Sequence, residues 1–141
     1  LTATLTPAAA TSKFLITFHV NASAANNQRG GIRVVRSIGG GSFSTFDLPD
    51  FSAGSLGGAT TSQGNRLRAH SIFTGRGSNI PNSPTSMTLF DHPNTTSAVT
   101  YKVQGMAEGS QVMYINQFET FTDASTVFAP MSTFTVMEIA G

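Results

Sequence analysis

The residues that could carry out acid, base or nucleophilic chemistry are few and scattered along this chain. There are three histidines (His19, His70 and His92), seven carboxylates and no cysteine. Catalysis by proton transfer or nucleophilic attack needs such groups to converge at one point. No zinc-protease, nucleophile-elbow, phosphate-loop or dinucleotide-binding motif links them. We therefore predict that the protein is not an enzyme and has no cofactor and no metal site.

One cluster of cationic side chains suggests binding rather than catalysis. A predicted strand at 66–73 places three of them on one face: Arg66, Arg68 and His70. If the predicted strand 31–37 is a neighbour, Arg33 and either Arg29 or Arg36 could extend this stripe. The stripe has three interpretations: it binds sulfated or carboxylated glycans, it pairs with carboxylates of a neighbouring subunit, or it is a solvated face. We assign it to a candidate subunit interface.

The composition favours strands and turns. Threonine and serine make up 35 of the 141 residues, whereas only 11% of residues are charged and the net charge is +1. Helices usually present Glu, Lys and Arg to solvent, while Thr suits strands and Gly, Asn and Ser suit turns. A net charge this small gives no electrostatic basis for binding nucleic acid. No run of residues approaches the length of an apolar membrane span, and the N-terminus lacks the pattern of a signal peptide.

Short segments of alternating apolar and polar residues recur about every ten residues, and no segment has the apolar stripe of a helix. The pattern predicts one domain over 1–141, an all-β, antiparallel, jelly-roll-like β-sandwich. Residues 1–12 are expected to be a lead-in segment and 47–64 a long loop. The strands 13–20 and 31–37 are interpreted as a hairpin or as neighbours. The predicted strands are 13–20, 31–37, 66–73, 86–91, 98–104, 112–118 and 132–139.

The last predicted strand is apolar on both faces. Because side chains alternate along a strand, Phe134 and Val136 point to one side while Met137 and Ile139 point to the other. A sandwich core buries only one of these sides. The other requires either a covering loop or a symmetric oligomer, and we predict a subunit interface formed by these four residues.

An ordered series of motifs resembles a fibre-type, C-terminal domain of structural proteins from tailed bacteriophages, especially cyanophages. The series runs nearly from end to end: LTATLTP at 1–7, TSKFLI at 11–16, DHPNTTS at 91–97, VTYKVQ at 99–104, YIN at 114–116 and STFTVMEI at 132–139. The resemblance implies a trimeric β-sandwich in a virion, made in the cytoplasm of the host bacterium. Its partners would be further copies of itself, other virion proteins and a host surface polysaccharide.

The function expected from this resemblance is that of a tail-fibre or appendage domain, acting in trimer assembly and attachment to host glycans. The alternatives are a capsid cement or decoration protein, and a glycan-degrading enzyme with its site between subunits. For glycan contact we predict Phe51 or Tyr101 as a stacking platform, with Arg76 and Asn79 in a turn as hydrogen-bonding groups.

Overall fold

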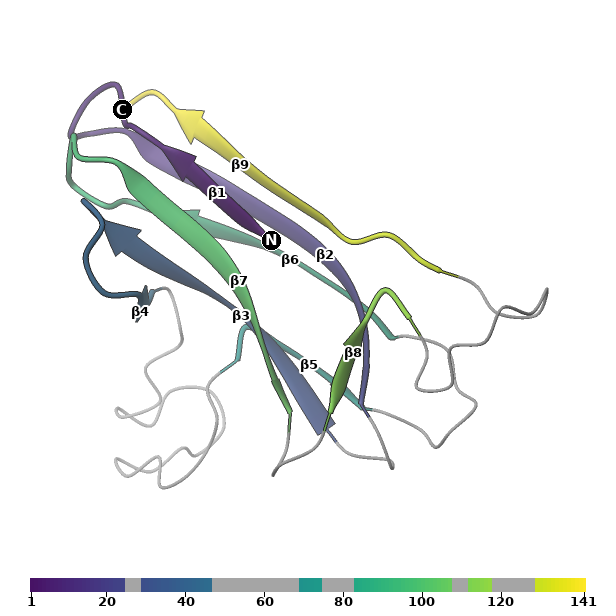
Figure 1. The fold of residues 1–141 in the computed structure, drawn as a ribbon. Helices are drawn as coiled ribbons and strands as arrows, with labels where there is room; N and C mark the ends of the chain where they lie inside the picture. The colour runs from purple at the N-terminus through teal and green to yellow at the C-terminus, as the bar shows by residue number, and fades with distance from the viewer. Residues whose placement is uncertain (25–28, 47–68, 75–82, 108–111, 118–128) are drawn as a thin grey trace, which may run out of the picture.

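The computed structural model describes residues 1–24, 29–46, 69–74, 83–107, 112–117 and 129–141, and these form nine strands and no helix. The strands make two antiparallel sheets that pack against each other (Figure 1). The prediction of an all-β, antiparallel sandwich is therefore confirmed. The predicted loop 47–64 lies outside the described residues.

The first sheet has β3 (Arg29–Ile38) at its centre. One edge of β3 pairs with β7 (Val99–Ala107), which pairs in turn with β1 (Thr2–Leu5). The other edge of β3 pairs with β4 (Ser44–Thr45) and, further along, with β5 (Ser71–Thr74). The predicted lead-in segment 1–12 contains β1, which forms the edge of this sheet beside β7.

The second sheet is organised around β2 (Lys13–Ala24). One edge of β2 pairs with β6 (Ser83–Asp91). Its other edge pairs with β9 (Thr133–Ile139) over the first half of the strand and with β8 (Met113–Ile115) at the end. The other three strands of this sheet thus all pair with β2.

The core lies between the two sheets and consists of the side chains that alternate toward the interior along each strand. In β2, the even-numbered residues from Phe14 to Ala22 are buried and face the first sheet. The first sheet contributes Ile32, Val34 and Val99 among others. This arrangement corrects the expected hairpin of 13–20 with 31–37, since β2 and β3 lie in opposite sheets. Both strands bury an apolar face, so they pack across the interior instead of sharing backbone hydrogen bonds.

Gly30 in β3 makes room for an aromatic ring. Gly30 pairs with Phe73 of β5, and a Cβ at Gly30 would lie 2.1 Å from Cζ of that buried ring. An aromatic ring that covers a cross-strand glycine cannot withdraw without leaving the core. The missing Cβ is therefore a packing requirement at this position.

We expect Gly30→Ala to lower the free energy of unfolding by about 2 kcal/mol, the usual effect of overpacking a core. Urea denaturation followed by circular dichroism measures the change. Gly105→Ala is the matched control, because the added Cβ would meet the flexible end of the Met113 side chain. Equal losses in the two variants would contradict this account of the Phe73 ring.

Candidate functional site

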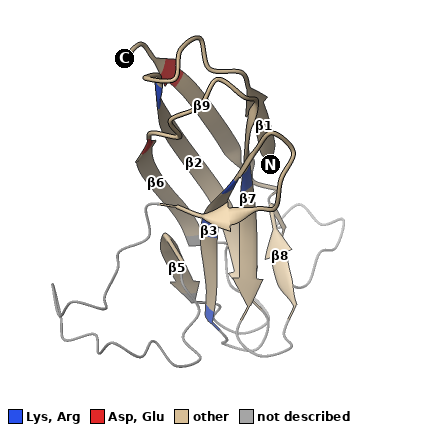
Figure 2. Cartoon of the chain, turned by 90° about the vertical axis from the view of Figure 1, so that its left-hand side faces the viewer, with Lys and Arg blue, Asp and Glu red and all other residues tan. Residues whose placement is uncertain are grey.

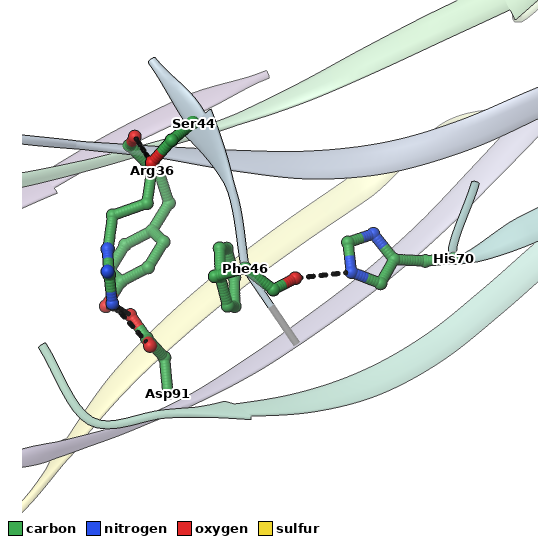
Figure 3. A network of polar contacts seen from close by, with 6 residues as sticks. Arg36, Ser44, Phe46, His70 and Asp91 are labelled. Atoms are coloured by element: carbon green, nitrogen blue, oxygen red, sulfur yellow. Dashed lines mark hydrogen bonds and ion pairs between the residues drawn. The ribbon is translucent and has the colours of Figure 1, made fainter. Parts of the chain in front are cut away.

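A polar cluster inside the sandwich joins the two sheets (Figure 3). The Nη1 of Arg36 on β3 donates to both carboxylate oxygens of Asp91 on β6, at 2.6 and 2.8 Å. The hydroxyl of Tyr101 on β7 donates to Oδ2 of the same carboxylate at 2.7 Å. Phe46 lies against the Arg36 guanidinium and against the Tyr101 ring, with centroid distances of 5.7 and 5.6 Å.

The electrostatics of this cluster favour a structural role. Burial raises the pKa of the Tyr101 phenol above its ordinary value, and the hydrogen bond to Asp91 and its negative charge raise it further. Tyr101 therefore stays protonated and remains a donor to Asp91. Since Arg36 and Tyr101 belong to the first sheet and Asp91 to the second, the cluster fixes the position of one sheet against the other.

His70 completes the hydrogen bonding along one edge of β3. Strand β5 pairs with β3 only as far as Ile32, and β4 begins to pair at Val35. Between them, Nδ1 of His70 accepts the backbone N–H of Val34 at 3.0 Å, and Nε2 donates to the carbonyl of Phe46 at 3.1 Å. The buried imidazole thus acts as a short piece of strand, in the tautomer that carries its proton on Nε2.

Replacing His70 by alanine leaves the Val34 N–H and the Phe46 carbonyl without this partner. We expect His70→Ala to lower the free energy of unfolding by about 1–3 kcal/mol, the loss for buried polar groups left unsatisfied. Thermal denaturation measures it. The control is His19→Ala, since His19 is only half-buried and its Nδ1 bonds to the exposed Ser86 hydroxyl. A loss at His70 no larger than at His19 would contradict the assigned role.

These positions change the interpretation of the cationic stripe. His70 faces the interior rather than a subunit interface, and Arg36 also points inward. Arg33 lies on the opposite face of β3, where its Nε donates to Oε1 of Gln104 at 2.9 Å. Arg66 and Arg68 lie outside the described residues.

The candidate glycan contacts are affected as well. Tyr101 is fully buried and packs 5.6 Å from the Phe14 ring, so its prediction as a sugar-stacking platform is wrong. Alternation on β7 explains this, since Val99 and Tyr101 share the inward face. Phe51, Arg76 and Asn79 lie outside the described residues.

A different surface stands out, which we call the outer face: the side of β9, β2 and β6 that points away from the first sheet. Its apolar residues form one row across the three strands, because Leu15 pairs with Met137 on one side and with Phe90 on the other. Directly opposed side chains on a sheet lie in contact. Met137 is 56% exposed and Phe90 48%, and Ile139 extends the row beside Lys13.

The outer face agrees with the prediction that β9 is apolar on both sides. Phe134 and Val136 pack against the core, while Met137 and Ile139 remain exposed. Leu15 and Phe90 were not among the predicted interface residues. Strand alternation would have found them, since each is an outward-facing apolar residue on a strand predicted from sequence.

The outer face is almost free of charge. Among the described residues of β9, β2 and β6, only Lys13 places a charged side chain on it, and Figure 2 shows these strands tan along most of their length. Glu138 is turned the other way and accepts the backbone N–H of Ala8 at 2.7 Å. Hydrogen bonds from the Ser12 hydroxyl and from Ala8 lower the pKa of Glu138. A protein partner for this face therefore needs no matching charge.

Hydroxyl side chains lie next to the apolar row. Thr17 pairs with Thr88 on one side and with Thr135 on the other. The next outward residue of β2 is His19, which pairs with Ser86, and its Nδ1 lies 2.7 Å from the serine hydroxyl. The amide nitrogen of Asn21 contacts His19 Nε2 at 3.1 Å and the Met131 carbonyl at 2.8 Å.

These contacts decide the role of the Ser86 and His19 pair. Because the Asn21 amide donates to both the Met131 carbonyl and His19 Nε2, the ring proton is on Nδ1 and is donated to Ser86. A general base would instead accept the proton of the serine. In this arrangement, His19 does not activate Ser86 as a nucleophile.

The fold and the outer face define an all-β domain with an exposed apolar sheet surface. Comparison of the chain with known protein families, with curated proteins and with solved structures finds no match. In the part of the chain that the structure describes, no helix is long and apolar enough to cross a membrane. The same residues contain no group of three or more His, Asp or Glu side chains that could hold a metal ion.

Proposed function

We propose that the protein is a non-enzymatic structural domain of a tailed-bacteriophage virion, in which identical subunits assemble through the outer face. The observation that carries the proposal is the apolar row of Met137, Leu15 and Phe90 on a nearly uncharged sheet surface. Large exposed apolar patches on soluble proteins usually mark interaction sites. The sequence resemblance implies that three subunits assemble.

Self-association suits this surface for a physical reason. Apolar surface contributes about 25 cal/mol per Å² when it is removed from water. A second copy brings an equally apolar surface, and among the described residues of these strands only Lys13, at the end of the row, must keep access to water when two such faces meet. Hydroxyl groups beside the row can bond to water at the rim of such a contact.

In a virion, such an assembly would act by presenting repeated weak contacts. Linked copies can bind a repetitive host polysaccharide roughly 10²–10⁴ times more tightly than one copy. We propose a tail-fibre or appendage position, with the capsid cement role as the alternative. The number of copies per virion separates the two, because a cement protein is present in hundreds of copies and a fibre in few.

The first experiment is the solution mass of the isolated protein by light scattering over a range of concentrations. The monomer has a mass of 14.8 kDa, and we expect a mass of three subunits or a multiple of three. A monomer at the highest concentration would overturn the proposed assembly through the outer face.

A further inference from the structure

Among the described residues, β6 is the longest edge strand of the second sheet. It has nine residues and pairs with β2 on one side, and within the described residues no strand pairs with its other side. The other edge strands are shorter: β1, β4, β5 and β8 have two to four residues, and β9 has seven. The free edge of a strand presents N–H and C=O groups that can pair with another strand.

Features that usually prevent such pairing are almost absent from β6. Monomeric proteins protect long edges with lysine, inward charges, bulges or proline. The only proline in β6 is Pro84, at its second residue, and its only charged residue is Asp91, at its last. Asp91 is buried and bound to Arg36, so it places no charge on the edge. Apolar side chains remain exposed on both sides of the strand, at Met87 and Phe90.

We propose that β6 pairs with β6 of a second copy of this chain, antiparallel and around a two-fold axis. A two-fold axis perpendicular to a sheet makes two identical edge strands antiparallel without any further requirement. A second copy is also the partner whose edge has the same length and the same lack of charge. The paired strands would join two four-stranded sheets into one.

Side-chain chemistry selects the register. Outward residues must meet outward residues, so the sum of paired residue numbers is even. With the axis at Thr88, the two Thr88 side chains meet on the outer face, and Met87 meets Leu89 of the partner subunit on the inner side. This register excludes Pro84, which has no N–H to donate. It also covers the exposed Met87 with an apolar neighbour.

The size of the outer face gives a second reason for an additional contact. From the usual strand spacing and rise, the planar area of β9, β2 and β6 is about 14 Å by 24 Å, or roughly 340 Å². Stable interfaces bury about 800 Å² per partner. Pairing through β6 would place two outer faces side by side and double the available surface. The pairing adds to the proposed outer-face contact but does not depend on it.

The test uses the natural absence of cysteine, which makes every introduced cysteine unique. Directly opposed positions on antiparallel strands have Cβ atoms about 4.5–5.5 Å apart, close to the Cβ separation in a disulfide. We expect Thr88→Cys to run mainly as a disulfide-linked dimer on a non-reducing gel after mild oxidation. The controls are Thr135→Cys, on the outer face of β9, and Thr4→Cys, on the exposed edge strand β1 of the other sheet. All three variants also carry Met137→Asp, which removes the proposed outer-face contact. Both controls should remain mainly monomeric on the gel.

Each other outcome contradicts the pairing. Equal cross-linking of Thr88→Cys and Thr135→Cys would indicate face-to-face packing instead, and equal cross-linking of Thr4→Cys would indicate random collision. No cross-linking of a Thr88→Cys variant with native circular dichroism would show that β6 is free in solution. Because the gel reports which positions are neighbours, a failed β6 pairing can be distinguished from a failed outer-face assembly, which the solution mass measures.

Discussion

Asp91→Ala should lower the free energy of unfolding by about 3–5 kcal/mol, the loss expected when one partner of a buried ion pair is removed. The variant leaves the Arg36 guanidinium without its counter-charge between the sheets and deprives the Tyr101 hydroxyl of its acceptor. For a domain of this size, the melting temperature should fall by on the order of 10 °C. Urea denaturation and calorimetry measure both quantities.

Two further variants separate the contributions in this cluster. Asp91→Asn keeps the size of the side chain and an acceptor for Tyr101 but removes the charge. The decrease in its free energy of unfolding therefore measures the contribution of the ion pair. Tyr101→Phe removes only the hydroxyl and should lower the free energy of unfolding by about 1 kcal/mol. If Asp91→Asn were as stable as the natural protein, the Arg36 to Asp91 contact would contribute nothing to holding the sheets together.

Met137→Asp should dissociate the assembly while leaving the subunit folded. In the single subunit Met137 is more than half exposed, so the free energy of unfolding should change by less than about 0.5 kcal/mol. In the assembly the carboxylate would be buried against Leu15 and Phe90 of another copy with no partner charge. We expect a loss of about 3 kcal/mol per contact, which is roughly a 100-fold weaker association.

The controls for Met137→Asp change apolar residues that do not lie on the outer face. Ile72→Asp changes an apolar residue that is 77% exposed on β5 of the first sheet, and we expect it to keep the natural mass. Phe134→Asp changes an inward-facing residue of the same strand, β9, and should unfold the subunit instead of dissociating it. An unchanged mass for Met137→Asp would overturn the outer face as the assembly surface.

Alternation accounts for the part of the fold that could be predicted. The even-numbered apolar residues of 13–20 and the two-sided pattern of 132–139 define strands whose faces the structure confirms. Alternation also predicts the direction of residues outside these two patterns. It places Leu15 outward and Arg36 inward, and an inward arginine requires a buried carboxylate.

Other features depend on contacts between distant segments and could not be read locally. The pairing of β2 with β6 and β9 joins residues about 70 and 120 positions apart, so the hairpin with the next strand was the simpler but wrong expectation. The contact between Asp91 and Arg36 joins residues 55 positions apart, so no local pattern indicates it. His70 acts through its side chain in a gap between two strands, which no periodic pattern reveals.

The central place of β2 has a consequence for how the chain folds as it is synthesised. Its partners are β6, β8 and β9, and all three follow β2 in the chain. During translation, β2 emerges before any of its partners and keeps its apolar face exposed until β9, which begins more than 100 residues after β2 ends, has also been made. Folding dominated by such distant pairings is slow, on the order of milliseconds to seconds. The second sheet should therefore close only after β9 has left the ribosome, and chains that still lack β9 are the form most exposed to aggregation.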